Sequence, residues 1–379
     1  MDFHYKQQDK SSIKNTHPIY AYVGCRTTKE RNARGKGINV YRMNQVTGTW
    51  THLQLVENII NPTFLAFDRN EQFLYVVHGD YSEVSSFHVD KFTGRLTFIN
   101  QQSTEGRNPV HLVVDPTNQF LIVANYMTGT LGVLPINSNG SLNPVCDLVK
   151  MPAALKHSTV DLFSKQGVSH PHHTPFDRDG RFVIVPDLGL NKIFIFTIDT
   201  SLGKLISHNP AFVETPIGSG PRHIDFHPTS SYAYVANELD STVGVYHYDS
   251  ENGEFKQAQI VEALKDGNSE NTLAEIVVAP SGNFLYVSNR GQDSITTFSI
   301  NQKTGLISYE NSESTLGKTP RFFTIDPNGN FLYVANEDSD TIITFKVDKE
   351  TGKLTNTGKI IESESPVCIV FSGNQNEKI

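Results

Sequence analysis

The sequence predicts an all-β protein, a seven-bladed β-propeller with four-stranded blades, and three observations lead to this fold class. One phrase recurs seven times along the 379 residues. Each copy holds about four short apolar runs of period two, separated by Gly, Asp and Asn turn residues. No helical periodicity of useful length is present. Four short strands in a repeat of about 40–50 residues are typical of a propeller blade, so seven repeats predict seven blades.

The repeated phrase is an apolar strand ending in Tyr-Val-x-Asn, a polar turn, a second alternating strand and Thr-Gly-x-Leu. In chain order, its first strand is expected at 19–24, 73–78, 120–125, 181–187, 232–237, 284–289 and 331–336. The valines of these strands are 47 to 62 residues apart. The longest spacing contains 143–169, an irregular segment that fits either a lid over the central channel or a tolerated surface loop.

The end of the chain predicts how the ring closes. Residues 365–371 match the strand that precedes Tyr-Val in the other repeats, such as 61–67, whereas the first repeat has no such strand before Ile19. The C-terminal strand is therefore expected to pair with 19–24, which removes two open sheet edges. An open sandwich of many strands is the alternative, but it does not explain the fixed register. The predicted organisation is a polar tail over 1–18 and one propeller domain over 19–379.

Composition restricts the partners and the compartment. The chain has 32 Lys and Arg against 40 Asp and Glu, a formal net charge of −8, so no nucleic-acid partner is predicted. The three cysteines lack CxxC spacing and fit a reducing compartment. The first 18 residues contain no secretory signal, and no stretch reaches 18 apolar residues, so no membrane is predicted. We expect a cytoplasmic protein with a small-molecule partner, and the oligomeric state stays open.

Residues at equivalent positions of the blades form rings around the channel, and two of these rings carry charge. The first ring follows the residue that opens the innermost strand and comprises Thr63, Val110, His172, Arg222, Ala274, Arg321 and Val367. The second ring follows Tyr-Val-x-Asn and comprises Arg26, Gly79, Tyr126, Leu188, Glu238, Arg290 and Glu337. We expect the charged members from the fourth to the seventh repeat to gather at one mouth of the channel.

A purely structural interpretation of these charges is also open. Charged side chains are almost never buried unless they are paired. Arg222 and Glu238 could therefore form a blade-locking salt bridge, and Arg321 and Glu337 could simply pair with each other. Arg26 lies in a polar loop that continues over 27–34, so we expect it to be solvated.

The functional interpretation rests on the chemistry of the same residues. Two or three guanidinium groups bind a carboxylate or a phosphate with bidentate geometry and stabilise a developing oxyanion. A glutamate and a histidine beside them can exchange protons with water or substrate. No Gly-x-Ser-x-Gly motif or catalytic Cys–His pattern is present, which disfavours covalent catalysis. The pattern suits attack by water or a proton on a small anionic molecule with a carbonyl group.

The run of 169–173, Ser-His-Pro-His-His, invites a metal interpretation. However, alternate residues of a strand face opposite sides, so His172 and His173 are not expected to face the channel together. No second His or Cys cluster is in register to complete a coordination sphere, so neither a metal nor another cofactor is predicted. His173, like His223 and His111 at the same register, is expected to lie against the neighbouring blade as a hydrogen-bonded core histidine.

From about 19 to 371 the chain resembles the seven-bladed propeller lactonases, which include bacterial propeller-type 6-phosphogluconolactonases and fungal 3-carboxy-cis,cis-muconate cyclases. The segments that carry the resemblance are 218–228, 234–239, 286–291, 187–189, 125–126 and 366–369. The resemblance implies hydrolysis of a sugar-acid lactone, with 6-phosphogluconolactone of the pentose phosphate pathway as first candidate. It implies that the catalytic residues are His172, Arg222, Glu238 and Arg290, the four that the rings also single out.

The expected roles follow from this resemblance. Arg222 and Arg290 hold the substrate anion and stabilise the oxyanion, Glu238 orients or deprotonates water, and His172 protonates the leaving ring oxygen. The acid and base roles can be exchanged. The expected substrate-binding residues are Arg321, Glu337, Tyr126 and His223.

Three departures from the family pattern bear on the substrate: the first blade at 22–28, His78-Gly79 in the second blade, and 143–169. Three other functions stay open. The first is a cyclase or lactonase acting on a carboxylated, muconate-type lactone. The second is a lactonase that depends on carboxylate-bound calcium, and the third is a non-catalytic scaffold.

Overall fold

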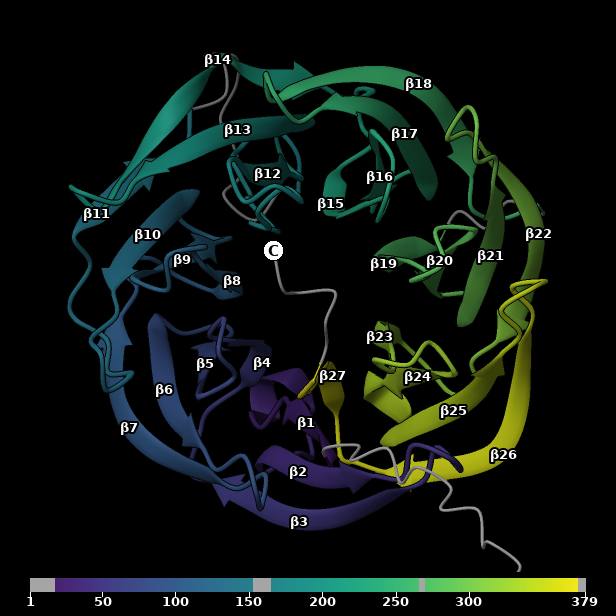
Figure 1. Ribbon diagram of the computed structural model, residues 1–379, viewed down its shortest axis with the longest axis horizontal. Coiled ribbons are helices and arrows are strands. Elements are labelled where there is room, and N and C mark those ends of the chain that lie inside the picture. Colours follow the sequence, from purple (N-terminus) through teal and green to yellow (C-terminus); the bar gives the residue numbers. More distant parts are fainter. Residues whose placement is uncertain (1–17, 153–164, 266–269, 374–379) are drawn as a thin grey trace, which may run out of the picture.

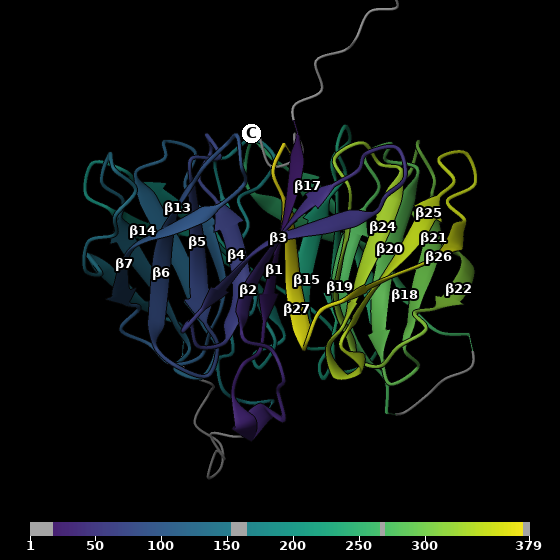
Figure 2. The same ribbon diagram turned by 90° about the horizontal axis from the view of Figure 1, so that it is seen from below.

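The computed structural model describes residues 18–152, 165–265 and 270–373, and it confirms the seven-bladed propeller. Seven antiparallel sheets stand around a central channel (Figure 1). From the side, the innermost strands run steeply along the channel from one face of the disc to the other (Figure 2). The predicted tail lies outside the described residues except for Pro18. No helix in the described part of the chain is long and apolar enough to cross a membrane.

The strands of each blade follow one another from the channel outwards. From the innermost to the outermost strand, the first three blades consist of β27 (Pro366–Phe371), β1 (Ile19–Cys25), β2 (Gly37–Met43) and β3 (Trp50–Glu57); β4 (Pro62–Phe67), β5 (Phe73–His78), β6 (Glu83–Val89) and β7 (Leu96–Ser103); and β8 (Pro109–Val114), β9 (Phe120–Asn125), β10 (Thr130–Pro135) and β11 (Asp147–Lys150).

The fifth to seventh blades have the same order. They consist of β15 (Pro221–Phe226), β16 (Tyr232–Asn237), β17 (Thr242–Asp249) and β18 (Glu254–Glu262); β19 (Thr272–Val278), β20 (Phe284–Arg290), β21 (Ser294–Ile300) and β22 (Ile307–Ser314); and β23 (Pro320–Ile325), β24 (Phe331–Asn336), β25 (Thr341–Val347) and β26 (Leu354–Glu362). Two short 3-10 helices complete the described elements, η1 (Lys29–Arg31) and η2 (Glu337–Ser339).

The fourth blade departs from the regular pattern. Its sheet has three strands, β12 (Val183–Asp187), β13 (Lys192–Asp199) and β14 (Lys204–Glu214). The innermost position is taken by an irregular segment that is joined to β12 by two isolated bridges, Pro171 with Asp187 and Phe176 with Val183. This segment carries the histidines of the Ser-His-Pro-His-His run, so those side chains are not held in a regular strand.

The ring closes as the sequence predicts. The C-terminal strand β27 is the innermost strand of the first blade and pairs with β1, with Val23 opposite Ile369. In Figure 1 the yellow β27 lies beside the purple β1. The inner edge of β1 is therefore covered, and the first blade has four strands like its neighbours.

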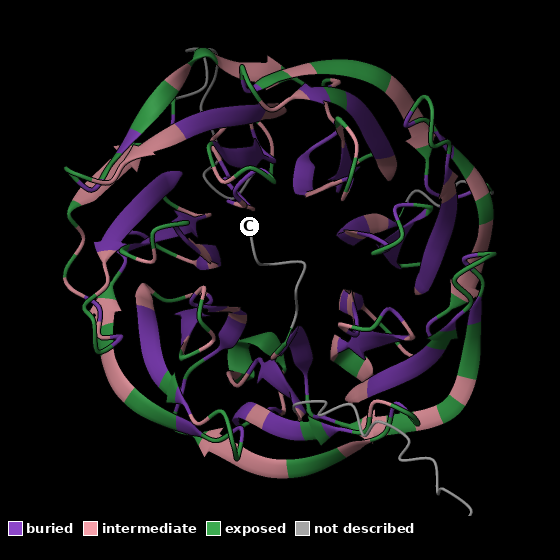
Figure 3. Ribbon diagram, viewed as in Figure 1, coloured by how far each residue is buried: buried purple, intermediate pink, exposed green. Residues whose placement is uncertain are grey.

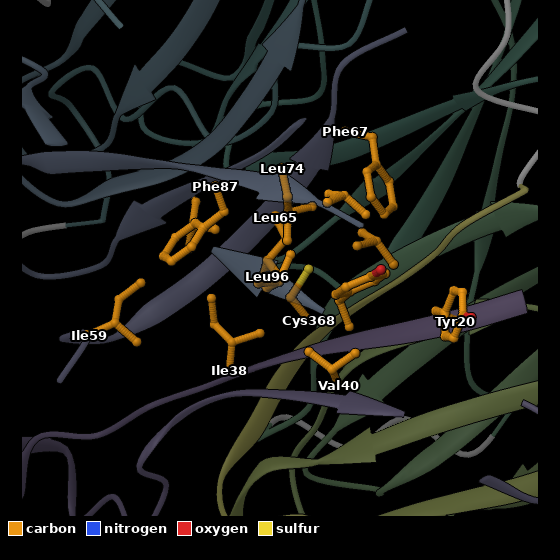
Figure 4. Close-up of a cluster of buried hydrophobic side chains, with 14 residues drawn as sticks. Tyr20, Ile38, Val40, Ile59, Leu65, Phe67, Leu74, Phe87, Leu96 and Cys368 are labelled. Carbon is orange, nitrogen blue, oxygen red and sulfur yellow. The ribbon is translucent and has the colours of Figure 1, made fainter. Parts of the chain in front are cut away.

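The hydrophobic core lies between adjacent blades. Inner strands are almost wholly buried, whereas the outermost strands alternate between covered and exposed residues (Figure 3). Between the first and second blades, Ile38 and Val40 face Leu65, Leu74 and the other side chains of one apolar cluster (Figure 4). Each blade therefore stabilises its neighbours by burying the apolar faces of both sheets.

The two parts of the repeated phrase meet across the blade interfaces. The hydroxyl of Tyr22, in the first blade, donates to the carbonyl of Gly94 in the second blade at 2.9 Å. The same inter-blade Tyr–Gly bond recurs from Tyr75 to Gly140, Tyr234 to Gly305, Tyr286 to Gly352 and Tyr333 to Gly48. The donor is always the tyrosine of Tyr-Val, and in four of these five bonds the acceptor is the glycine of Thr-Gly. The bond between them therefore explains why both residues recur in the repeat.

Candidate active site

A β-bulge aims the first ring of residues into the channel. In β15, Pro221 pairs with Asn237 and His223 with Ala236, which leaves Arg222 as the extra residue. The same register shift follows the first residue of β4, β8 and β23, and occurs in β19 and between β27 and β1. A bulge re-aims side chains and suspends the usual alternation of faces. Arg222 and His223 accordingly both contact β19.

Glu238, directly after β16, accepts contacts from three cations. Its Oε2 atom lies 3.2 Å from Nε of Arg222 and 3.0 Å from Nη2 of Arg290. Its Oε1 atom accepts a 2.8 Å hydrogen bond from Nζ of Lys165. The expected ion pair between Arg222 and Glu238 is therefore present, and Arg290 shares the same carboxylate oxygen.

Backbone carbonyls of β19 hold the two guanidinium groups in place. Nη1 of Arg222 donates to the carbonyl of Ala274, and Nη2 of Arg290 donates to that of Leu273 at 2.8 Å. Their positive ends are thus oriented before any ligand arrives, which is the arrangement that stabilises a developing oxyanion most effectively.

The charges around Glu238 keep it ionised. Burial alone would raise the pKa of this carboxyl, but the charges of Arg290, Arg222 and Lys165 outweigh burial and hold the pKa well below its ordinary value. A carboxylate with such a low pKa accepts a proton poorly at neutral pH.

His172 lies in the same mouth, and its own imidazole is neutral. Its ring centroid is 5.7 Å from that of Tyr126 and 5.2 Å from that of His223. Burial, followed by the charge of Arg222, lowers the pKa of His172 well below its ordinary value. A neutral histidine has one ring nitrogen free to accept a proton. Both carboxylate oxygens of Glu238 already contact cations, whereas Nδ1 of His172 has no partner among the described residues, so His172 is the group with a free acceptor for a proton from water.

A second ionised cluster occupies the opposite side of the mouth, on the first, second and seventh blades. Nε of Arg26 lies 2.8 Å from Glu337 and Nη1 lies 3.1 Å from Asp80. The expectation that Arg26 is solvated is wrong, because only 6% of the residue is exposed. The loop after Arg26 turns through η1, the dark-purple coil that projects from one face in Figure 2. The guanidinium itself is buried between the carboxylates of Asp80 and Glu337. The alternative pairing of Arg321 with Glu337 is present only as a 3.9 Å contact.

A layer of aromatic rings crosses the channel below the charges. The ring of His111 lies 4.3 Å from that of Phe64 and 4.1 Å from that of His173, which stacks on His223 at 4.3 Å. Phe322 lies 6.1 Å from Phe64 and completes the layer.

Each histidine of this layer contacts the next blade, as the sequence predicts. His111 is bonded to the hydroxyl of Thr174 at 2.9 Å, and the backbone N–H of Ile224 donates to His173 at 3.2 Å. The alternation expected of His172 and His173 does not hold in full, because both rings contact that of His223. Their segment is irregular, so the alternation of a regular strand does not apply.

The third histidine, His223, is paired with a buried carboxyl that the sequence reasoning missed. Its Nδ1 atom lies 2.9 Å from Oε1 of Glu275 on β19. Burial raises the pKa of Glu275 to about 8, and burial together with Arg222 lowers the pKa of His223 well below its ordinary value. Both groups are therefore neutral at pH 7, and a hydrogen bond joins the carboxyl to the imidazole.

Several buried polar atoms around the mouth have no hydrogen-bond partner among the described residues. They are Thr63 Oγ1, His172 Nδ1, Arg222 Nε, His223 Nε2, Glu275 Oε2 and Arg290 Nε. Arg222 Nε lies 3.2 Å from Glu238 as an ion pair but does not form a hydrogen bond with it. Buried polar atoms are normally satisfied, and a cluster of exceptions indicates a place where water or a polar ligand binds. All six lie in the two charged rings or in the layer directly below them.

Three charged residues of this region escaped the comparison of repeats. Lys165 belongs to the irregular segment 143–169 and has no register position; residues 153–164 of that segment lie outside the described residues. Asp80 follows Gly79, one position beyond the second ring. Glu275 stands at the register of His223, one position beyond Ala274, so extending the first ring by one residue would have found it.

The other half of the channel is hollow. A cavity of about 580 Å³ lies beyond the aromatic layer and is lined by the far ends of the innermost strands, including Phe67, Val114 and Phe226. Within residues 18–152, 165–265 and 270–373, no three His, Cys, Asp or Glu side chains converge as metal ligands. Metal independence stays a prediction.

The fold and the site define a propeller with a cationic pocket at one mouth of its channel. The chain belongs to the seven-bladed β-propeller lactonase family, whose model matches residues 20–371. It is 34% identical over 355 residues to the 6-phosphogluconolactonase of Bacillus subtilis, covering 92% of this chain and 97% of that protein. It is also 34% identical to the 6-phosphogluconolactonase of Formosa agariphila, over 80% of this chain and 86% of that protein.

A solved structure shows the same architecture. The periplasmic gluconolactonase of Pseudomonas aeruginosa superposes with a TM-score of 0.85 at 30% identity, covering 93% of this chain and 99% of that one. The likeness therefore extends over the whole ring, including the blades that form the mouth.

Proposed function

We propose that this protein hydrolyses a sugar-acid lactone, with 6-phosphogluconolactone as substrate and 6-phosphogluconate as product. The names of the relatives support the reaction. The observation that carries the proposal is the excess of positive charge at the mouth, which suits an anionic substrate. Six cations, Arg26, Arg31, Lys165, Arg222, Arg290 and Arg321, meet three carboxylates, Asp80, Glu238 and Glu337.

In the proposed mechanism, Arg222 and Arg290 donate to the lactone carbonyl oxygen. Water attacks the carbonyl carbon while neutral His172 accepts the proton that the water loses. The resulting oxyanion lies against the two guanidinium groups. As the tetrahedral intermediate collapses, the bond between the carbonyl carbon and the ring oxygen breaks, and His172 returns the proton to the leaving oxygen. Glu238 keeps the arginines in position rather than acting as the base, because its pKa is held low.

Arg321, Glu337 and Tyr126 remain our proposed substrate-binding residues, since all three belong to the rings at this mouth. His223 contributes more indirectly, because it lies in the aromatic layer beneath His172. We also propose a cytoplasmic location and a role in the pentose phosphate pathway. The three cysteines, Cys25, Cys146 and Cys368, are free, which suits a reducing compartment.

The direct test is hydrolysis of 6-phosphogluconolactone by the purified protein, followed by the acid released in a pH-stat. We expect a rate well above spontaneous hydrolysis that survives exhaustive chelation. His172→Gln should lower kcat by about 100-fold or more, the usual contribution of a general base, without lowering the melting temperature. His88→Gln, at an exposed histidine of β6, is the control and should leave the rate unchanged.

Two results would contradict this proposal. Turnover no faster than the spontaneous reaction would contradict the proposed lactonase activity. Full activity of His172→Gln would remove the assigned base. A panel that includes a carboxylated, muconate-type lactone would show whether that substrate is preferred.

A further inference from the structure

Arg321 is the least satisfied of the six cations at the mouth. Its side chain is only 20% exposed, yet among the described residues its guanidinium makes no hydrogen bond. Its nearest carboxylate, on Glu337, is 3.9 Å from Nε, and that same carboxylate is 2.8 Å from Arg26. Each of the other cations has an oxygen partner within 3.2 Å.

The position of Arg321 is central. It occupies the bulge of β23, between Pro320 and Phe322, where the register shift aims it into the channel. Its charge acts on groups of four other blades, namely Asp80, Tyr126, His172 and Glu275. One side chain acts electrostatically on groups from so many blades only if it lies near the axis on which they converge.

Such a guanidinium lacks a ligand. Burial, followed by the neighbouring charge of Arg26, lowers the pKa of Arg321 to about 9, and the 3.9 Å contact with Glu337 does not compensate this charge. A guanidinium has five N–H donors in a planar fork that matches the oxygens of a phosphate or a carboxylate. A multivalent anion at this place would satisfy donors that no described residue satisfies.

Arg321 is separate from the groups that act on the carbonyl. Arg222 and Arg290 contact Glu238 and the carbonyls of β19, on the fifth and sixth blades. Arg321 is on the seventh blade and makes none of these contacts. In a 6-phosphosugar lactone, the reacting carbonyl and the phosphate are likewise at opposite ends of the molecule. The two ends thus have separate cationic partners across the mouth.

We propose that Arg321 binds the phosphate of a phosphorylated sugar lactone and makes the protein select phosphorylated over unphosphorylated substrates. This assignment rests on the proposed lactonase function and adds the substrate group that Arg321 recognises. Arg321 is a specificity residue in this assignment, and the reacting carbonyl is left to Arg222 and Arg290.

The test compares two lactones that differ only in the phosphate, 6-phosphogluconolactone and gluconolactone. Arg321→Gln should lower kcat/KM by about 10- to 100-fold for the phosphorylated lactone, the loss expected for a hydrogen-bonded charge pair, mainly through KM. The loss on gluconolactone should be much smaller. Arg321→Lys keeps the charge without the planar fork, so its kcat/KM for the phosphorylated lactone should lie between that of the wild type and that of Arg321→Gln.

Lys318→Gln is the matched control. It removes one positive charge from an exposed position just before the same strand, and it should leave kcat/KM unchanged for both lactones. Arg321→Gln should also keep or raise the melting temperature, because it removes a buried charge and leaves Glu337 paired with Arg26. Equal losses on both lactones, with a lowered melting temperature, would make Arg321 a structural residue and overturn the assignment.

Binding separates this assignment from the reaction itself. Calorimetry with 6-phosphogluconate and gluconate needs no turnover, so it tests Arg321 even if the wild-type protein hydrolyses neither lactone. We expect Arg321→Gln to weaken 6-phosphogluconate binding selectively. Unchanged binding of 6-phosphogluconate would overturn the proposal, as would an equal loss of gluconate binding.

Discussion

Glu238 illustrates how one side chain serves both interpretations of the charged rings. Its contacts with Arg222 and Arg290 are the salt bridges of the structural alternative. Yet a carboxylate that locks two arginines also fixes where their remaining N–H donors point. The ion pairs and the proposed oxyanion stabilisation therefore depend on each other, and the presence of the bridge does not argue against a catalytic role.

The buried carboxyl of Glu275 makes a prediction about pH and stability. It faces His223, Arg222 and Asp225 on β15 and Arg321 on β23. Since its pKa is raised to about 8, the folded protein keeps the proton where the unfolded chain loses it. Its stabilising effect is thus fully present below about pH 4.5 and is lost as pH rises through 8, by about 1.4 kcal/mol per pH unit within that window.

Glu275→Gln tests this directly, because the amide can still hydrogen-bond to His223 but cannot ionise. The variant should match the wild type near pH 5 and exceed it in free energy of unfolding near pH 9, as measured by urea denaturation across that range. Parallel pH profiles for the two proteins would show that Glu275 ionises normally.

At the scale of the element, backbone conformation and packing explain why the repeat has a glycine at position 352. Gly352 has a φ of +70°, and a Cβ atom there would lie 2.4 Å from the ring of Phe284 in the adjacent blade. Gly358 has a similar φ of +73°, but nothing lies within 4 Å of its Cβ position. The two glycines share a left-handed backbone conformation, which any side chain would strain. They differ in whether an added Cβ atom would also meet a neighbouring side chain.

Substitution by alanine should separate these effects. Gly358→Ala should cost about 1–2 kcal/mol of unfolding free energy from the left-handed backbone alone. Gly352→Ala should cost a further 1–3 kcal/mol or so from overpacking against Phe284. Chemical denaturation of both variants measures the difference, and equal losses would show that the blade interface yields without strain.

The bulges mark the limit of what the sequence predicts at this scale. The repeats placed Arg222, Glu238 and Arg290 in two rings, and the structure brings these three into contact. The alternation rule then failed for His172 and His173, because bulges and irregular strands turn consecutive residues toward the same side. Lys165 could not be placed at all, since it lies outside the repeat register and only the folded ring brings it to Glu238.

At the scale of the whole molecule, the fold and its closure were predictable because the first repeat lacks one strand and the last segment supplies it. Removal of 366–379 should therefore abolish cooperative thermal unfolding, since it uncovers the buried inner face of β1. Removal of 374–379 alone should leave the melting temperature unchanged.

A peptide spanning 365–373 should restore the transition in the shorter protein, whereas the same peptide with Ile369→Asp, which buries a charge, should not. A cooperative transition in the shorter protein without any peptide would show that six blades and an open sheet suffice.

Closure by the last strand also sets an order of events during synthesis. Tyr20 and Ser372 are hydrogen-bonded across 352 positions of sequence, so the edge of β1 stays uncovered until residues 366–372 have left the ribosome. The backbone N–H of Arg26 donates to the carbonyl of Ser365 at 3.0 Å, which ties the second ionised cluster to the same late event. A nascent chain can assemble its earlier blades as they emerge, but the charged mouth of the channel is completed only once residues 365–372 have been made.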